Sequence, residues 1–186
     1  MDKQEGKLYV ISSPSGGGKS TVINEVMKIE PNLTYSISAT TRPPRANERD
    51  GKEYFFLSEK DFFKYIEQNK FIEWEQVHGF YYGTLRQQIE DKTSRGKKVI
   101  LDIDVQGGLN IKNSFSESIL IFLWLPSLQV LEQRLRNRGT ENEEILGKRL
   151  LRAEEELKKA DYYDYIIIND KLDNTIKETL TIIKKT

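Results

Sequence analysis

The stretch that most constrains the fold is a glycine-rich turn that follows a short apolar run near the start of the chain. Leu8 to Ile11 has the composition of a strand, the sequence SSPSGGGKST forms the turn, and the apolar spacing from Val22 onward is that of a helix. Strand, loop and helix in this order are the context of a phosphate-binding loop. Backbone N–H groups of such a loop and the positive end of the helix dipole converge on one group of phosphate oxygens. The stretch therefore predicts a site for a nucleoside triphosphate.

The lysine and the hydroxyls of this turn have expected roles. Lys19 is expected to reach the β- and γ-phosphates, and Ser20 to ligate Mg²⁺. The pattern G-x-x-x-x-G-K-[ST] has a glycine where this chain has Ser13. The alternative is a flexible turn that carries a surface lysine, but the flanking strand and helix argue against it. The predicted ATP-binding residues of the loop are Ser13, Pro14, Ser15, Gly16, Gly17, Gly18, Lys19, Ser20 and Thr21.

Composition limits the cellular compartment and the classes of partner that we expect for this protein. The chain has 186 residues, 29 basic and 29 acidic side chains, and no cysteine. A balanced charge gives no overall attraction to nucleic acid or membrane, and the lack of cysteine suits a reducing compartment. No apolar run approaches the roughly 20 residues of a membrane span, and the polar start is not a signal peptide. We expect a soluble cytoplasmic protein that binds neither nucleic acid nor membrane, and both a monomer and a homodimer remain open.

Four apolar runs predict an α/β fold. Their Val, Ile and Leu density without alternation is typical of parallel strands covered on both faces, and helical patterns separate them. We expect one domain over residues 1–186, whose core takes up about residues 1–34, 85–128 and 155–186. The predicted strands are Leu8–Ile11, Lys98–Ile103, Ile119–Leu125 and Tyr165–Ile168.

Two segments interrupt the alternation of strands and helices. Residues 35–84 are rich in β-forming side chains, from a run at Tyr35–Thr41 onward, and contain one helix that Ser58 can cap; they predict an inserted mixed β-lobe. Gln129–Ala160 predicts two charged helices separated at Arg138-Gly139-Thr140, of which about residues 129–154 form a lid. Such charge density also fits a merely solvated helical surface.

Two carboxylates end one of the predicted strands. Asp102 and Asp104 follow an apolar run, and side chains two apart on a strand share one face. Ligands of α/β sheets gather at the carboxyl ends of the strands, where a carboxylate can complete the Mg²⁺ shell beside the phosphate loop. An acidic strand terminus without a ligand is the alternative. Because two carboxylates in an apolar strand are costly without a partner, we favour the functional interpretation.

The inserted segment carries a cationic clamp. Arg42 and Arg45 lie three apart around a Pro-Pro corner, where rigid backbone can direct two guanidinium groups at phosphate oxygens. With this clamp included, the sequence closely resembles the guanylate kinases over nearly its whole length. The resemblance rests on SPSGGGKST, TTRPPR, FIEW, YYGT, VILDIDVQG and the RxxxRGTExEE region, in that order.

The resemblance implies transfer of the γ-phosphoryl group of ATP to GMP, and to dGMP as well, with Mg²⁺. It also implies a P-loop NTPase-type parallel sheet flanked by helices, an inserted mixed β GMP-binding lobe and a helical lid. Catalytic roles are implied for Lys19, Arg42, Arg134, Arg138 and Arg149, and a place near the donor's adenine for Asn169. Metal ligation is implied for Ser20 and Asp102. The implied GMP-binding residues are Ser38, Arg42, Arg45, Tyr54, Glu73, Tyr82, Thr84, Asp102 and Asp104.

The residue types agree with that activity. Guanine presents N1–H and an exocyclic NH₂ on one edge, and the carboxylate of Glu73 can accept from both, whereas it would repel the N1 lone pair of adenine. A kinase for another nucleoside monophosphate is the first alternative and predicts no carboxylate there. A guanylate-kinase-like module that binds phosphopeptides without catalysis is the second. Loss of the loop lysine and glycines would mark it, and here Gly16, Gly18, Lys19 and Ser20 are present.

Overall fold

The centre of the protein is a parallel sheet of five strands in the order β2-β7-β1-β8-β9. The computed structural model describes residues 6–77, 79–137 and 143–186. Each pairing within this sheet is parallel, which requires a crossover connection between neighbouring strands. The strands are β1 (Leu8–Ser12), β2 (Leu33–Tyr35), β7 (Lys98–Asp102), β8 (Ile119–Trp124) and β9 (Tyr165–Ile168).

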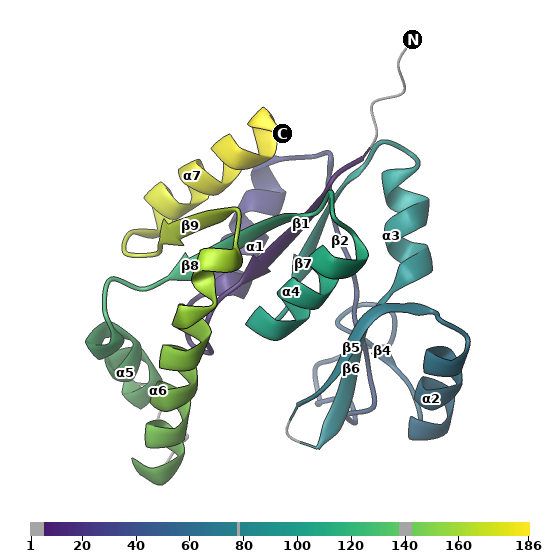
Figure 1. The fold of residues 1–186 in the computed structure, drawn as a ribbon, viewed down its shortest axis with the longest axis horizontal. Coiled ribbons are helices and arrows are strands. Elements are labelled where there is room, and N and C mark those ends of the chain that lie inside the picture. The colour runs from purple at the N-terminus through teal and green to yellow at the C-terminus, as the bar shows by residue number, and fades with distance from the viewer. Residues whose placement is uncertain (1–5, 78, 138–142) are drawn as a thin grey trace.

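Helices cover both faces of this sheet (Figure 1). Val22 and Val26 of α1 and Leu180 of α7 pack with one face, while Ile89 of α3 and Ile111 of α4 pack with the other. The central strand β1 is buried along its whole length, so its apolar run needs no alternation. The bounds are α1 (Lys19–Ile29), α3 (Arg86–Thr93), α4 (Val105–Ser114), the 3₁₀ turn η1 (Ala160–Tyr162) and α7 (Leu172–Lys185).

A second, mixed sheet forms the lobe. Its strand order is β4-β3-β6-β5, and a small core of Ala39, Phe62 and Phe71 lies between it and α2. The side chain of Ser58 accepts from the backbone N–H of Asp61, as the sequence predicts for the start of α2. The elements are β3 (Ala39–Thr40), β4 (Phe55–Phe56), α2 (Glu59–Glu67), β5 (Phe71–Val77) and β6 (Phe80–Leu85).

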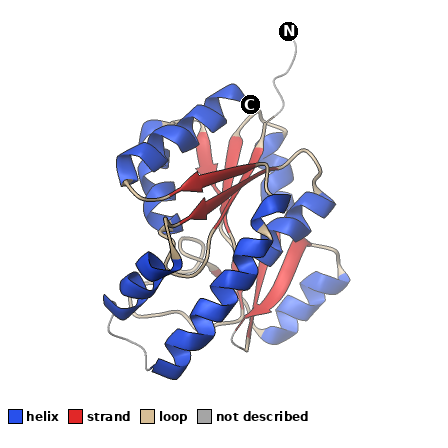
Figure 2. Cartoon of the chain, turned by 60° about the vertical axis from the view of Figure 1, so that its left-hand side comes forward, coloured by secondary structure: helices blue, strands red, loops and turns tan. Residues whose placement is uncertain are grey.

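Two helices, α5 (Leu128–Asn137) and α6 (Glu143–Lys158), form the segment predicted as a lid. Leu131 and Leu135 of α5 meet Leu146 and Ala153 of α6 in a separate apolar cluster. The segment and the β-lobe project from the same end of the core, opposite the chain termini (Figures 1 and 2). The predicted break at Arg138-Gly139-Thr140 lies outside the described residues.

The predicted fold class is confirmed: an α/β parallel sheet flanked by helices, with a separate mixed sheet. Two details differ. The predicted β-run Tyr35–Thr41 is divided, because β2 ends at Tyr35 in the core sheet and β3 begins at Ala39 in the lobe. β9 is an edge strand rather than a fully covered one, and Ile166 and Ile168 are each 48% exposed. None of the described helices has the length and apolar character needed to cross a bilayer.

Candidate active site

The predicted phosphate loop joins β1 to α1. Gly16 and Gly18 have φ angles of 95° and 93°, which L side chains rarely adopt, and Gly18 is the N-cap of α1. Lys19 is the first helical residue, and its Nζ donates to the backbone oxygen of Ser13 at 3.2 Å. The loop thus faces the N-terminus of a helix, the arrangement that binds phosphate.

Ser13, the departure from the general pattern, fits this loop. It is buried, and its hydroxyl donates to the backbone oxygen of Pro14 at 3.0 Å. A Cβ at Gly17 would lie 2.5 Å from that hydroxyl oxygen. The serine therefore occupies space that a glycine at position 17 leaves open.

Asn169 supports the loop from behind. Its Nδ2 donates to the backbone oxygen of Gly17 at 2.7 Å, and its Oδ1 accepts from the hydroxyl of Thr175 at 3.0 Å. Asn169 is 4% exposed and is hydrogen-bonded to the loop backbone. Its predicted place near the adenine of the donor stays a prediction. Sequence reasoning missed Thr175, because nothing local distinguishes a threonine in the first turn of α7. Arg134 of α5 approaches the same point, with Nη2 donating to the backbone oxygen of Asn169 at 3.4 Å.

Ser20 and Asp102 meet beside the loop. The Ser20 hydroxyl donates to Oδ2 of Asp102 at 2.9 Å, and Nζ of Lys19 lies 3.9 Å from Oδ1. Mg²⁺ prefers oxygen ligands and keeps several waters when it binds phosphates, so one hydroxyl and one carboxylate fit its needs here. Among the described residues, no group of three or more acidic, histidine or cysteine side chains could hold a metal by itself.

The sequence predicts that Asp102 and Asp104 share one face of a strand, and this prediction is wrong. β7 ends at Asp102, and Asp104 is the N-cap of α4, where its Oδ1 accepts from the backbone N–H of Gly107 at 2.8 Å. An aspartate before a helix satisfies a backbone N–H that would otherwise be unpaired, and this local preference outweighs the continuation of the strand. Both carboxylates nevertheless border one cavity.

Glu73 also lines that cavity. It is 7% exposed, and its Oε1 accepts from the hydroxyl of Thr84 at 2.6 Å. Burial raises its pKa to about 7, although the Thr84 hydroxyl lowers it in part. A carboxyl group in this position is poised to accept hydrogen bonds from a ligand that brings its own donors.

Arg42 is fixed by a residue that sequence reasoning did not assign. Its Nη2 donates to both carboxylate oxygens of Glu48 at 2.9 Å, and its guanidinium carbon lies 5.4 Å from the centre of the Tyr54 ring. The rings of Tyr54 and Tyr82 are 6.0 Å apart. Arg45 is exposed, and its backbone N–H donates to Glu48. An acidic residue six positions after the first arginine was the available signal for Glu48.

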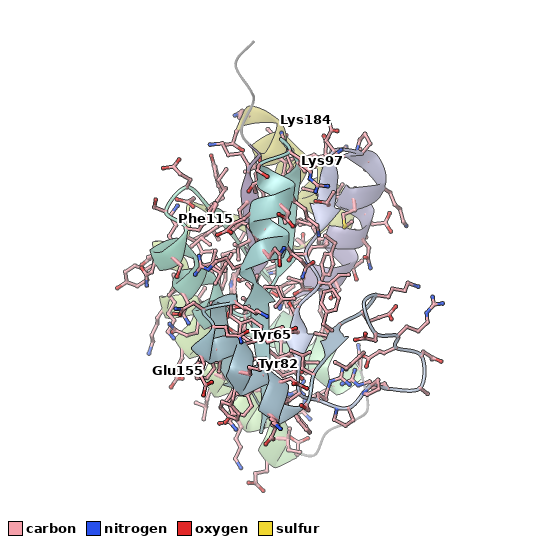
Figure 3. The ribbon with its side chains drawn as sticks, turned by 90° about the vertical axis from the view of Figure 1, so that its right-hand side faces the viewer. Tyr65, Tyr82, Lys97, Phe115, Glu155 and Lys184 are labelled. Atoms are coloured by element: carbon pink, nitrogen blue, oxygen red, sulfur yellow. The ribbon has the colours of Figure 1, made fainter. Side chains whose placement is uncertain are left out.

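The segment predicted as a lid contributes cations near the phosphate loop and Asp104. Nη1 of Arg149 lies 3.5 Å from the Ser15 hydroxyl, and Nη2 of Arg152 lies 3.9 Å from Oδ2 of Asp104. Arg138, a predicted catalytic residue, lies outside the described residues. Figure 3 shows Tyr82 in the β-lobe, far from Lys97 and Lys184 at the other end of the molecule.

Three cavities meet at Lys19. A cavity of about 180 Å³ lies between the β-lobe and the core, one of about 520 Å³ lies beneath α6, and one of about 190 Å³ lies within the phosphate loop. The first, called the acceptor cavity below, is lined by Lys19 and by six of the predicted GMP-binding residues: Ser38, Tyr54, Glu73, Tyr82, Asp102 and Asp104.

Comparison with known proteins decides the family. The guanylate kinase family model matches residues 5–186. Guanylate kinases of Thermotoga maritima and Bacteroides thetaiotaomicron are 44% and 46% identical to this chain, over 97% and 100% of its length and 87% and 92% of theirs. The chain belongs to the guanylate kinase family. A crystal structure of guanylate kinase from Anaplasma phagocytophilum has a TM-score of 0.79 at 30% identity and covers 98% of this chain and 87% of that one. A shikimate kinase from Bacteroides thetaiotaomicron, 12% identical with a TM-score of 0.52, shares the fold alone.

Membership in the guanylate kinase family confirms the resemblance drawn from the six sequence motifs. The roles of individual residues remain predictions, because family membership does not test them one by one. The geometry brings Lys19, Ser20, Asp102 and Arg134 to the phosphate loop. It brings Glu73, Tyr54 and Tyr82 to the neighbouring cavity, where Thr84 is hydrogen-bonded to Glu73.

Proposed function

We propose that the protein transfers the γ-phosphoryl group of ATP to GMP and releases ADP and GDP. The observation that carries this proposal is the position of Lys19, which lines the acceptor cavity, the cavity beneath α6 and the phosphate loop at once. A cation shared by a donor site and an acceptor site is placed where a phosphoryl group would pass between them.

The donor side is supported by the loop. Backbone N–H groups around Gly16 and Gly18 would bind the ATP phosphates at the N-terminus of α1. Ser20 and Asp102 would hold Mg²⁺, which neutralises phosphate charge when it is bound. Arg134 contacts Asn169 next to the loop and Arg149 contacts Ser15 within it, so both would add positive charge around the transferring group.

The acceptor side is supported by the cavity. Glu73 would accept the N1–H and NH₂ donors of guanine, with Thr84 orienting its carboxylate. Arg42, held by Glu48 and stacked near Tyr54, would bind the GMP phosphate together with Tyr82 and Arg45. The same contacts suit dGMP as a second acceptor.

Transfer then needs little covalent chemistry from the protein. An oxygen of the GMP phosphate attacks the γ-phosphorus, the new P–O bond forms, and the bond to the β-phosphate oxygen breaks with its electrons going to ADP. No general base is assigned, because the attacking oxygen is already anionic. Positioning and charge neutralisation carry the rate. We place this activity in the cytoplasm, whose reducing conditions suit a chain without cysteine.

A panel of nucleoside monophosphates with Mg-ATP tests the proposal. We expect GDP formation from GMP, less product from dGMP, and little from AMP or UMP. Lys19→Ala should lower turnover by roughly 10²–10³-fold, since one preorganised charge at the transition state is lost. Lys28→Ala is the matched control, because Lys28 is an exposed lysine of the same helix, paired with Glu25.

Two results would contradict the proposal. A Lys19→Ala protein that phosphorylates GMP at the wild-type rate would remove the loop from catalysis. Binding of a phosphopeptide without any turnover of GMP would instead favour the non-catalytic module.

A further inference from the structure

A second glutamate of β5 faces the acceptor cavity. Side chains alternate along a strand, so Glu75 lies on the same face as Glu73, two residues further toward the phosphate loop. Both line the cavity between the β-lobe and the core, together with Tyr82 and Asp104. The residues directly opposite on β6 are Thr84 for Glu73 and Tyr82 for Glu75.

Glu75 has an oxygen without a partner. Its Oε2 is buried and makes no hydrogen bond to any described residue. The neighbouring Asp104 is close enough to share a proton with the Glu75 carboxyl when one of the two is protonated. Its own oxygens accept from the Gly107 N–H and lie 3.9 Å from Arg152, so between two ionised carboxylates Oε2 of Glu75 has no donor. A buried acceptor without a hydrogen bond is costly, so native structures contain such a group where water or a ligand supplies the missing donor.

The position of Glu75 indicates which part of a nucleotide would meet it. The inference rests on the proposed function, in which guanine lies at the Glu73–Thr84 pair and the phosphate at Tyr82, Tyr54 and Arg42. The ribose joins these two groups, so it must pass the next step of the β5–β6 ladder, about 7 Å along the strand from Glu73. That step is the Glu75–Tyr82 pair.

We propose that Glu75 accepts a hydrogen bond from a ribose hydroxyl of the acceptor nucleotide and thereby favours ribonucleotide over deoxyribonucleotide. The hydroxyl supplies the donor that Oε2 lacks. Burial and the neighbouring Asp104 raise the pKa of Glu75, while Arg152 and Lys159 lower it in part, so the binding test belongs at pH 8, where ionisation of the carboxyl is favoured. Glu75 is thus a specificity-determining residue and takes no part in phosphoryl transfer.

Acceptor binding without ATP gives the most direct test. Calorimetry at pH 8 would measure the dissociation constants of GMP, 2′-deoxy-GMP and 3′-deoxy-GMP for the wild-type protein. We expect GMP to bind about tenfold more tightly than at least one deoxy analogue, the effect of one hydrogen bond to a charged group. In Glu75→Ala that ratio should fall toward one, and in Glu75→Gln, which keeps a neutral acceptor, it should be intermediate.

Gln76→Ala is the matched control, since Gln76 is exposed on the opposite face of the same strand and should leave the ratio unchanged. Thermal unfolding of each variant shows that it is folded, and Glu75→Gln preserves the volume if the alanine variant does not fold. The same GMP-to-deoxy ratios in wild type and both Glu75 variants would overturn the inference while leaving the proposed function intact. Failure of the wild-type protein to bind GMP would instead overturn the proposed function.

Discussion

Glu73 combines a buried carboxyl group with a neutral hydrogen-bond donor, the Thr84 hydroxyl. Burial raises its pKa to about 7 in the folded protein, against an ordinary 4.5. Between these two pH values the folded state binds a proton that the unfolded state releases. The free energy of unfolding therefore falls as pH rises from about 4.5 to 7.

We expect Glu73→Gln to remove this pH dependence. A neutral amide has no charge to desolvate, so the variant should gain stability relative to wild type as pH rises from about 5 to about 8, by about 2–3 kcal/mol. Urea unfolding of both proteins at the two pH values measures the difference. An equal difference at both values would show that the Glu73 carboxyl is not buried as described.

The same variant should lose guanine recognition. The amide NH₂ would face the donors of guanine, and unpaired polar groups discriminate strongly in a buried site. kcat/KM for GMP should fall steeply, and that for AMP much less. Unchanged preference for GMP over AMP would remove Glu73 from base recognition.

At the scale of an element, the junction between the phosphate loop and α1 depends on a glycine. A Cβ at Gly18 would lie 2.7 Å from Nδ2 of Asn169, and the φ angle of 93° is strained for any other residue. We expect Gly18→Ala to cost about 1–3 kcal/mol of unfolding free energy and to weaken ATP binding. Chemical denaturation and nucleotide titration measure the two effects.

Gly147→Ala is the control for that substitution. Gly147 lies within α6, and a Cβ added there would have nothing within 4 Å, so alanine should be neutral or stabilise by up to about 1 kcal/mol. If the two alanine variants lost equal stability, the tight contact with Asn169 would not be the cause.

Elements whose signals are local in sequence were predictable. The loop glycines, the Ser58 cap and the apolar runs act within a few residues of themselves, so their patterns indicate the structure directly. The end of β7 was harder, because capping by Asp104 competes with strand continuation and only the following helix decides between them. The exposure of β9 depends on its place at the edge of the sheet and on which face there lacks a helix. The residues of the strand itself do not indicate either.

Contacts between distant segments explain what the sequence could not predict in the site. Thr175 orients Asn169, and Glu48 fixes Arg42, through side chains whose residue types are common at surfaces. Arg152 meets Asp104 across two elements that are far apart in the chain. Their roles follow from packing, which brings together residues that carry no shared motif.

At the scale of the whole molecule, the groups proposed to meet one phosphoryl group stand on three bodies. Arg42 belongs to the β-lobe, Arg149 to α6 and Lys19 to the core. An open site would also let water compete with GMP as the acceptor. We expect the lobe and the two lid helices to close on the nucleotides, so a bisubstrate analogue should lower the radius of gyration measured by small-angle scattering.

GMP alone and an ATP analogue alone are the controls and should each give a smaller decrease than the bisubstrate analogue. An unchanged radius of gyration, with saturation verified by calorimetry, would contradict closure from the ligand-free state.

The bond between Asn169 and Gly17 has a consequence for how the protein is made. The two residues are 152 positions apart, so the loop leaves the ribosome long before its support is synthesised. At the usual pace of translation this interval is roughly 8–30 s. For the first part of that time β1 also lacks its neighbours β7 and β8, which are synthesised before Asn169. Tyr9 waits still longer, because its hydroxyl donates to the backbone oxygen of Ile183 in α7. The phosphate-binding loop therefore gains the support of Asn169 only after nine tenths of the sequence has been synthesised.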